Sequence, residues 1–208
     1  IKYYPTVAGD FRMYVTMGCC APHPNVGFPE EIHQMMESKL LIEGTPFPLK
    51  ILSAEMMSNR SIAIGAALRS VIAGSENDID IYFRDAHNNP TSVDMLNFPK
   101  IKFYLWDVAK DRNVSLSQEE GGPLSIQIIE TNLDKVKIRI NMTLAGTYNL
   151  NILLNDEHVM GSPFPRVYVH AAKASAQNVV CSGIGIRQGS KNTSYPFKIT
   201  LKDIYNNP

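Results

Sequence analysis

The sequence predicts an all-β protein built from antiparallel, immunoglobulin-like β-sandwich repeats in tandem, with a short helical insertion in the first. Three observations predict this fold class: self-similarity at a period of 118 residues, short segments in which apolar and polar residues alternate, and turn-forming residues between those segments. A unit of this length far exceeds the roughly 20–50 residues of a solenoid repeat. We therefore expect each unit to be a domain with its own core.

Composition is that of an ordinary globular protein. The chain has 208 residues, 44% of them hydrophobic, and its 20 basic and 20 acidic residues give a formal net charge of +0. Without clustered Lys and Arg there is no surface to collect phosphates, so nucleic acid is not an expected partner. No apolar run approaches the roughly 18–20 residues that cross a bilayer, so we expect no membrane contact within this segment.

The repeat sets the expected domain boundaries. Residues 54–90 align without gaps on residues 172–208, so that Asp85 matches Asp203 and both segments end in Asn-Asn-Pro. Because the chain begins at Ile1 and stops inside this repeated motif, we interpret it as a piece of a longer protein. The predicted domains are the closing part of one repeat at 1–52, a complete repeat at 53–170, and the opening part of another at 171–208.

The first repeat carries an insertion. GTPFPLKI and GSPFPRVYV lie 117 residues apart, whereas VAGDFRMYV and LAGTYNLNI lie 137 apart, which places extra residues at about 17–43. Pro29 followed by two glutamates, with Ile32, Met35 and Met36 at helical spacing, predicts a short amphipathic helix there. Cys19, Cys20, His23 and His33 match no common zinc spacing, so we favour an ordinary insertion loop over a metal site.

The complete repeat shows strands with period-2 alternation. Trp106, the only tryptophan, is expected to pack in the core as a strand aromatic, with a ligand-facing position as the alternative. Turn signals rich in Gly, Pro, Asn and Asp separate the strands. The apolar residues expected to face inward include Ile79, Ile81 and Phe83, then Val136, Ile138, Ile140 and Met142, then Tyr148, Leu150, Ile152 and Leu154, and finally Phe164, Val167 and Val169.

Nothing in the sequence predicts catalysis or a cofactor. No nucleophile motif and no HExxH helix accompanies the five histidines, so we expect a non-enzymatic protein. The three cysteines form no visible disulfide framework, which favours a reducing compartment. Four Asn-x-Ser/Thr triplets, at Asn59, Asn113, Asn141 and Asn192, shift the balance slightly towards secretion.

The order of motifs resembles the filamin-type immunoglobulin repeat family. LAGTYNLNI, the polar turn NDEHVM, GSPFPRVYV, AKASAQNVVCSGIGI and a strand ending in Lys-Asp-x-x-Asn-Asn-Pro together carry this resemblance, which covers essentially the whole chain. The middle repeat departs from the family by about 20 additional residues, mainly between Pro90 and Val136. We therefore expect a divergent protein with filamin-type repeats.

The resemblance implies scaffolding. It implies repeats that act as spacers and protein-docking modules in a cytoplasmic, cytoskeletal or ciliary protein, or alternatively in an adhesion or gamete-surface ectodomain. Expected partners are neighbouring repeats, cytoskeletal filaments, and an extended peptide that adds as a strand by β-augmentation. The residues assigned to this docking surface lie in two predicted strands and are Lys100, Ile101, Lys102, Phe103, Tyr104, Leu105, Trp106, Leu124, Ile126 and Ile128.

Overall fold

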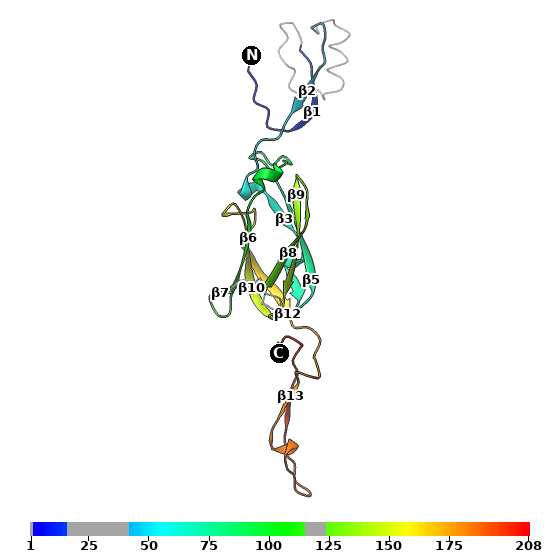
Figure 1. The fold of residues 1–208 in the computed structure, drawn as a ribbon, viewed down its shortest axis with the longest axis vertical. Helices are drawn as coiled ribbons and strands as arrows, with labels where there is room; N and C mark the ends of the chain where they lie inside the picture. The colour runs from blue at the N-terminus through cyan, green and yellow to red at the C-terminus, as the bar shows by residue number, and fades with distance from the viewer. Residues whose placement is uncertain (1, 16–41, 115–123) are drawn as a thin grey trace, which may run out of the picture. The chain divides into compact units, whose positions relative to one another are not determined.

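The computed structural model describes residues 2–15, 42–114 and 124–208. The chain divides into two compact units, Ile1–Ser53 and Ala54–Pro208, and each is described by itself (Figure 1). No helix among the described residues has both the length and the apolar character that crossing a membrane requires. The helical elements of that part are single 3-10 turns, namely η1 (Ser58–Arg60), η2 (Ala66–Leu68), η3 (Met95–Asn97) and η4 (Ile184–Ile186).

The first unit contains one hairpin-like pair of strands. β1 (Gly9–Met13) pairs antiparallel with β2 (Phe47–Ile51), with Gly9 opposite Ile51 and Met13 opposite Phe47. The Val15 N–H donates to Thr45 Oγ1 at 3.0 Å beyond the ladder. The predicted helix and the Cys/His cluster lie outside the described residues.

The second unit contains a two-layer β-sandwich. Its antiparallel architecture confirms the predicted immunoglobulin-like fold class. One sheet has the order β3 (Ile62–Ile64), β5 (Glu76–Tyr82), β9 (Lys135–Met142) and β8 (Leu124–Thr131). The other has the order β4 (Ser70–Ile72), β12 (Phe164–His170), β10 (Gly146–Leu154), β6 (Ile101–Asp107) and β7 (Arg112–Val114), with β11 (Glu157–His158) also paired to β10.

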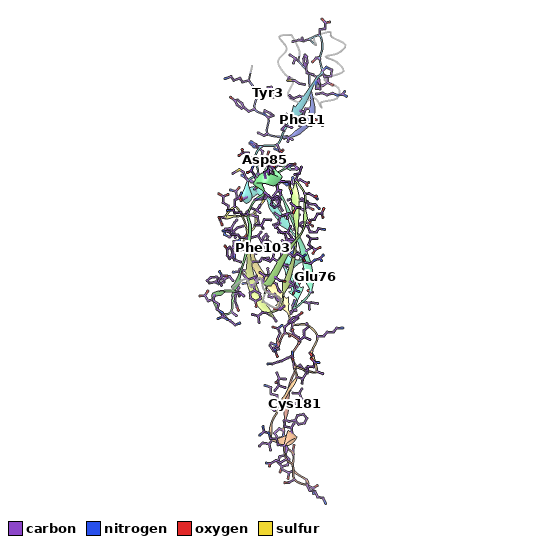
Figure 2. The ribbon with its side chains drawn as sticks, in the orientation of Figure 1. Tyr3, Phe11, Glu76, Asp85, Phe103 and Cys181 are labelled. Atoms are coloured by element: carbon purple, nitrogen blue, oxygen red, sulfur yellow. The ribbon has the colours of Figure 1, made fainter. Side chains whose placement is uncertain are left out.

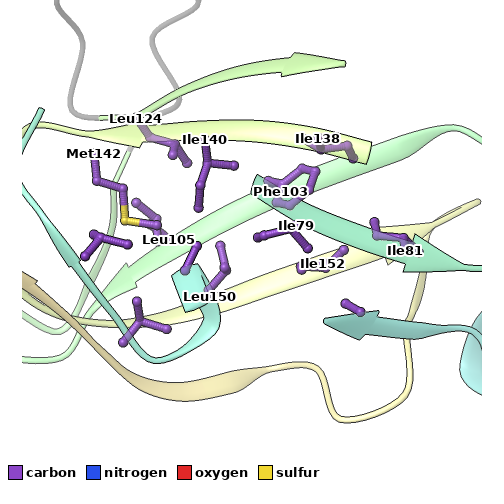
Figure 3. Close-up of a cluster of buried hydrophobic side chains, with 14 of the residues drawn as sticks. Ile79, Ile81, Phe103, Leu105, Leu124, Ile138, Ile140, Met142, Leu150 and Ile152 are labelled. Atoms are coloured by element: carbon purple, nitrogen blue, oxygen red, sulfur yellow. The ribbon is translucent and has the colours of Figure 1, made fainter. Parts of the chain in front are cut away.

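The core lies between these two sheets and follows the predicted alternation. Ile79 and Ile81 of β5 and Ile138 of β9 are each 0% exposed, while the residues next to them in sequence are partly exposed on the opposite face. Figure 3 shows these side chains together with Phe103, Leu150 and Ile152 in the space between the strands. Because each strand contributes alternate residues to one face, burial of this apolar surface stabilises both sheets at once.

One expectation about the core is wrong. Trp106 is 40% exposed and faces outward from β6, whereas Phe103 and Leu105 are 2% and 1% exposed. The segment has apolar or aromatic residues at both parities of the strand, so composition does not decide which set faces inward. The period of two does decide it: with Phe103 and Leu105 buried, Tyr104 and Trp106 must point to the other face.

A second antiparallel pair follows the sandwich within the same unit. β13 (Val180–Ser182) pairs with β14 (Lys198–Thr200), and both strands are largely exposed. The segment then turns at Asp203 and ends at Pro208.

Candidate functional site

Strand β6 directs its backbone groups alternately to β10 and to the opposite side. The Asn155 N–H donates to the Lys100 carbonyl at 2.9 Å and the Val108 N–H to the Thr147 carbonyl at 3.1 Å, so the even-numbered residues of β6 bond to β10. Successive residues of an antiparallel strand direct their N–H and C=O groups to alternate sides. The backbone groups of Ile101 and Phe103 therefore point away from β10.

Strand β7 covers only the far end of this edge. It pairs with β6 from Leu105 opposite Val114 to Asp107 opposite Arg112. Within the described part of the chain, no strand pairs with the same edge at Ile101–Tyr104. Among the residues that the structure describes, the end of the strand proposed for docking is thus covered by β7, and no strand covers its beginning.

The turn that forms β7 depends on a buried carboxylate. Asp107 is 5% exposed and accepts hydrogen bonds from the N–H groups of Ala109 and Lys110 at 3.0 and 3.1 Å. Burial raises the pKa of Asp107, but these hydrogen bonds and the Lys110 ammonium at 3.3 Å outweigh it and lower the pKa. Asp111, with φ of 49°, then turns the chain back. The sequence analysis missed this hairpin, although Asp107 and Asp111 are turn-forming residues at its ends.

Strand β8 exposes apolar side chains on its inner face. Leu124, Ile126 and Ile128 pair with Met142, Ile140 and Ile138, which are all buried, so the six share one face of the sheet. Leu124 is 1% exposed, but Ile126 is 36% exposed and Ile128 is 52% exposed. The sandwich therefore closes over the beginning of β8 and leaves its later inner-face residues open to solvent.

The predicted docking residues thus separate into groups. Phe103, Leu105 and Leu124 belong to the core, and Tyr104 and Trp106 lie on the outer face of β6. The two lysines are tied to the turn between β10 and β11: the Lys100 N–H donates to Asn155 Oδ1 at 2.9 Å, and the Lys102 ammonium pairs with Asp156. The residues that combine accessibility with an inner-face or free-edge position are Ile101, Ile126 and Ile128. We call these three residues, with the free backbone of Phe103, the β6–β8 edge.

A buried carboxylate, that of Asp85, lies at the end of the sandwich, in the connection between β5 and β6 (Figure 2). Asp85 is 1% exposed and accepts hydrogen bonds from the N–H groups of Ala54, His87 and Asn89 at 3.0, 2.8 and 2.9 Å. The Asn89 side chain adds a fourth at 2.9 Å. Burial alone would raise the pKa of Asp85, but these four bonds, led by that of the Asn89 side chain, lower it to about 2.

The same arrangement recurs 118 residues later. Asp203 is 1% exposed and accepts from the N–H groups of Ala172, Tyr205 and Asn207 at 2.9, 2.9 and 2.8 Å, and from the Asn207 side chain at 2.8 Å. Each partner stands at the position equivalent to its counterpart around Asp85. The two Asn-Asn-Pro segments are therefore one repeated structure whose carboxylate holds the start of its own repeat.

Asn207 also joins this turn to the preceding sandwich. Its Oδ1 accepts from the Ala145 N–H at 2.8 Å and its Nδ2 donates to the Thr143 carbonyl at 2.8 Å. These groups belong to the connection between β9 and β10, where Tyr148 Oη donates to the Leu144 carbonyl at 3.0 Å. The Asn207 side chain is thus integrated into the loop between β9 and β10.

The described parts of the chain contain no cluster of metal-ligating side chains. No group of three or more His, Cys, Asp or Glu side chains in residues 2–15, 42–114 and 124–208 could hold a metal ion. The two carboxylates with the most complete hydrogen bonding, Asp85 and Asp203, are fully occupied by their turns. The accessible feature that remains is the β6–β8 edge.

Comparison with solved structures returns a filamin domain, an adhesin and domains of an S-layer protein. The Lin-41 filamin domain aligns at 15% identity with a TM-score of 0.39, covering 57% of this chain and 98% of that one. The Escherichia coli adhesin FdeC aligns at 16% identity and 0.47, covering 81% and 48%, and domains 4 and 5 of the S-layer protein SbsC at 10% and 0.35, covering 61% and 58%. No curated protein sequence matches the chain.

The sequence profile of the Filamin/ABP280 repeat matches residues 56–165. This range begins just before η1 and ends in β12, so it contains nearly all of the sandwich and more than half of the chain. The chain therefore belongs to the Filamin/ABP280 repeat family.

Proposed function

We propose that this protein is a non-enzymatic scaffold segment whose repeats act as spacers and protein-docking modules, and that the β6–β8 edge receives an extended peptide. Family membership supports the general role, since filamin repeats are structural and interaction domains. The observation that carries the specific proposal is the exposure of Ile126 and Ile128 on the inner face of β8. It is joined by the beginning of β6, whose outward backbone groups pair with no other strand among the described residues.

The geometry fits recognition by strand addition. A peptide antiparallel or parallel to β6 would bond with the N–H and C=O groups of Ile101 and Phe103, and the main chain would supply sequence-independent affinity. Alternate peptide side chains would then face the isoleucines of β8 and bury their exposed surface, which would favour apolar residues at every second position. The covered end at Leu105–Asp107 limits the added strand to the beginning of β6.

Two variants test this proposal without disturbing the core. Ile101→Pro removes an N–H that faces the free edge at the first residue of β6, where proline is tolerated. Ile128→Glu places a charge on a residue that is already 52% exposed. Phe103→Pro is unsuitable because Phe103 is 2% exposed and its replacement would damage the sandwich.

The measurement uses peptides selected from a random display library against the wild-type chain. We expect the affinity of the selected peptides to fall at least tenfold in both variants, with the Phe103 amide gaining protection from hydrogen exchange on binding to wild type. Ile64→Glu is the matched control, because Ile64 is 57% exposed on β3, a strand at another edge. Binding that is unchanged in both edge variants, or that falls equally in the control, would place the docking surface elsewhere.

The cellular setting has two candidates. The absence of a disulfide framework favours a cytoplasmic protein of the cytoskeleton or cilium, with filaments as further partners. Three exposed asparagines in glycosylation triplets, at positions 59, 113 and 192, favour an adhesive cell-surface ectodomain. The β6–β8 edge would bind a peptide in the same way in either setting.

A further inference from the structure

The outer face of β6 places an exposed indole between two carboxamides. Trp106 is 40% exposed, and in the sheet it stands opposite Asn149 of β10 on one side and Asn113 of β7 on the other. Directly opposed residues have Cβ atoms about 4.5–5.5 Å apart and share one face. The same face continues through Tyr104, which is 37% exposed and stands opposite Asn151. A shallow depression is lined by Tyr104, Trp106, Asn113, Asn151, Leu153 and His158.

Asn113 is also the acceptor residue of the triplet Asn113-Val114-Ser115. Its side chain is exposed on a three-residue strand at the end of its sheet, a position that an enzyme can reach. Asn141 differs, because it is half-buried with Oδ1 buried and Nδ2 directed at the Gly74 carbonyl at 3.5 Å. Asn59 and Asn192 are exposed in a 3-10 turn and a loop, so neither stands opposite an aromatic residue in a ladder.

We propose that Asn113 carries an N-linked glycan whose first N-acetylglucosamine packs against the Trp106 ring. In the modification, the Asn113 carboxamide nitrogen loses a proton and bonds to the anomeric carbon of the sugar, while a lipid pyrophosphate carrier departs as the leaving group. The apolar C–H face of a pyranose and the electron-rich face of an indole are complementary, because the ring quadrupole is negative on its face. This contact would explain why the only tryptophan of the chain lies outside the core.

The neighbouring carboxamides suit the polar edge of such a sugar. Asn149 Oδ1 already accepts the Arg166 N–H at 3.2 Å, which leaves its Nδ2 to donate to a hydroxyl or acetamido oxygen. Asn151 Nδ2 makes only long contacts, at 3.4 Å to the carbonyls of Tyr104 and Asn149. A sugar placed there would be held by stacking on Trp106 and by hydrogen bonds from the adjacent strand.

The position on β7 gives the glycan a second effect. β7 has a neighbour on one side only among the described residues, and an exposed edge of this kind can pair with another chain. A bulky hydrated group on Asn113 would block that pairing and leave Ile101 and Phe103 of β6 open. The inference does not depend on peptide docking, since it concerns the outer face alone, but it rests on the cell-surface setting of the proposed function, because N-glycans are added to secreted chains.

The first test is glycopeptide mass spectrometry of the protein isolated from its native source. We expect hexosamine-bearing peptides that contain Asn113 and an unmodified Asn141. An unmodified Asn113 in the native protein would overturn the proposal, whatever is found at Asn59 or Asn192.

The second test measures the contact itself, using the single tryptophan as its own probe. Chains secreted from a eukaryotic host would be compared by acrylamide quenching of Trp106 fluorescence. We expect the quenching constant to rise about twofold in Asn113→Gln relative to the glycosylated wild type. Asn192→Gln, which removes another acceptor triplet far along the sequence, should leave it unchanged.

Thermal unfolding provides an independent measurement. Loss of the contact should lower the Tm of Asn113→Gln by about 2–4 °C, the scale expected for a single favourable contact in a domain of this size. The same drop should be absent when Asn113→Gln is made in a Trp106→Leu background, because the stacking partner is already gone. Equal quenching with and without the Asn113 glycan would overturn the stacked geometry even if Asn113 is modified.

Discussion

Asp85 holds four hydrogen-bond donors with one carboxylate, and this single residue makes the stability of the sandwich pH-dependent. Its pKa in the folded protein is about 2, below the ordinary value of about 4 for an unfolded chain. A group with a lowered folded pKa contributes its full stabilisation above about pH 4 and loses it as the pH falls towards about 2. Acid should therefore weaken the end of the sandwich where the repeat begins.

Asp85→Asn should lower the free energy of unfolding by on the order of 2 kcal/mol at pH 7, because an amide cannot accept all of these bonds. The variant should also lose part of the dependence on pH between about 4 and 2. Urea unfolding at a series of pH values measures both effects. Asp94→Asn is the control, since Asp94 accepts one exposed bond from the Leu96 N–H at 3.0 Å. Equal losses in the two variants would contradict this account.

The hydroxyl of Tyr148 is hydrogen-bonded to the loop between β9 and β10. Its hydroxyl donates to the Leu144 carbonyl at 3.0 Å, while burial, with a smaller effect of Asp107, raises the pKa of Tyr148 to about 12. Tyr148→Phe keeps the ring in the core and removes only this bond, so we expect a loss of about 1 kcal/mol in chemical unfolding. Tyr104→Phe, on an exposed strand position, should change stability by less than about 0.5 kcal/mol.

At the scale of elements, η2 fits against β5 because Gly65 has no side chain. A Cβ at Gly65 would lie 2.6 Å from the Asp78 carbonyl oxygen and 3.1 Å from the Ile79 Cα, both backbone atoms that cannot rotate away. Gly65→Ala should therefore destabilise the domain by at least about 1–3 kcal/mol through overpacking. Gly189→Ala is the control, since its Cβ would meet only the Tyr195 ring at 3.6 Å. Denaturant midpoints compare the two, and a stable Gly65→Ala would show that η2 can move off the sheet.

The strands that the sequence predicted well are those with one clearly apolar face. β5, β9 and β10 alternate between hydrophobic and polar residues, so the period of two specified both the element and its buried side. β6 was predicted as a strand, but which of its faces is buried was not predicted correctly. Both faces carry large apolar or aromatic side chains, Phe103 and Leu105 on one and Tyr104 and Trp106 on the other. The three-residue strands β4 and β7 were not predicted, because pairing with a neighbouring strand rather than a local sequence pattern forms them. The candidate site on β6 depends on the pairing of β6 with β7, which no local pattern predicts.

At the scale of the whole molecule, the Asn207 side chain connects the turn at Asp203 to main-chain atoms of the loop between β9 and β10. Replacing Asn207 by alanine removes its bonds to Thr143 and Ala145, together with the bond to Asp203. We expect the Ala145 amide to lose at least tenfold of its hydrogen-exchange protection, while amides in the middle of β9 and β10 change little. Uniform loss of protection across the sandwich would indicate instead that the third segment is part of its core. Asn178→Ala, which removes one bond to the Asp203 carbonyl, controls for damage to the turn alone.

The parallel pairing of β4 with β12 affects how the sandwich responds to tension. β4 follows the start of the repeat and β12 forms its end, and they run in the same direction through the pairs Tyr168–Ser70, Val169–Val71 and His170–Ile72. A pull on the two ends of the repeat draws such strands past each other along their length, so the bonds of the ladder must break together rather than one after another. Antiparallel hairpins pulled from their open end unzip singly and resist weakly. The short β4–β12 ladder is therefore loaded in shear when the two ends of the sandwich are pulled apart.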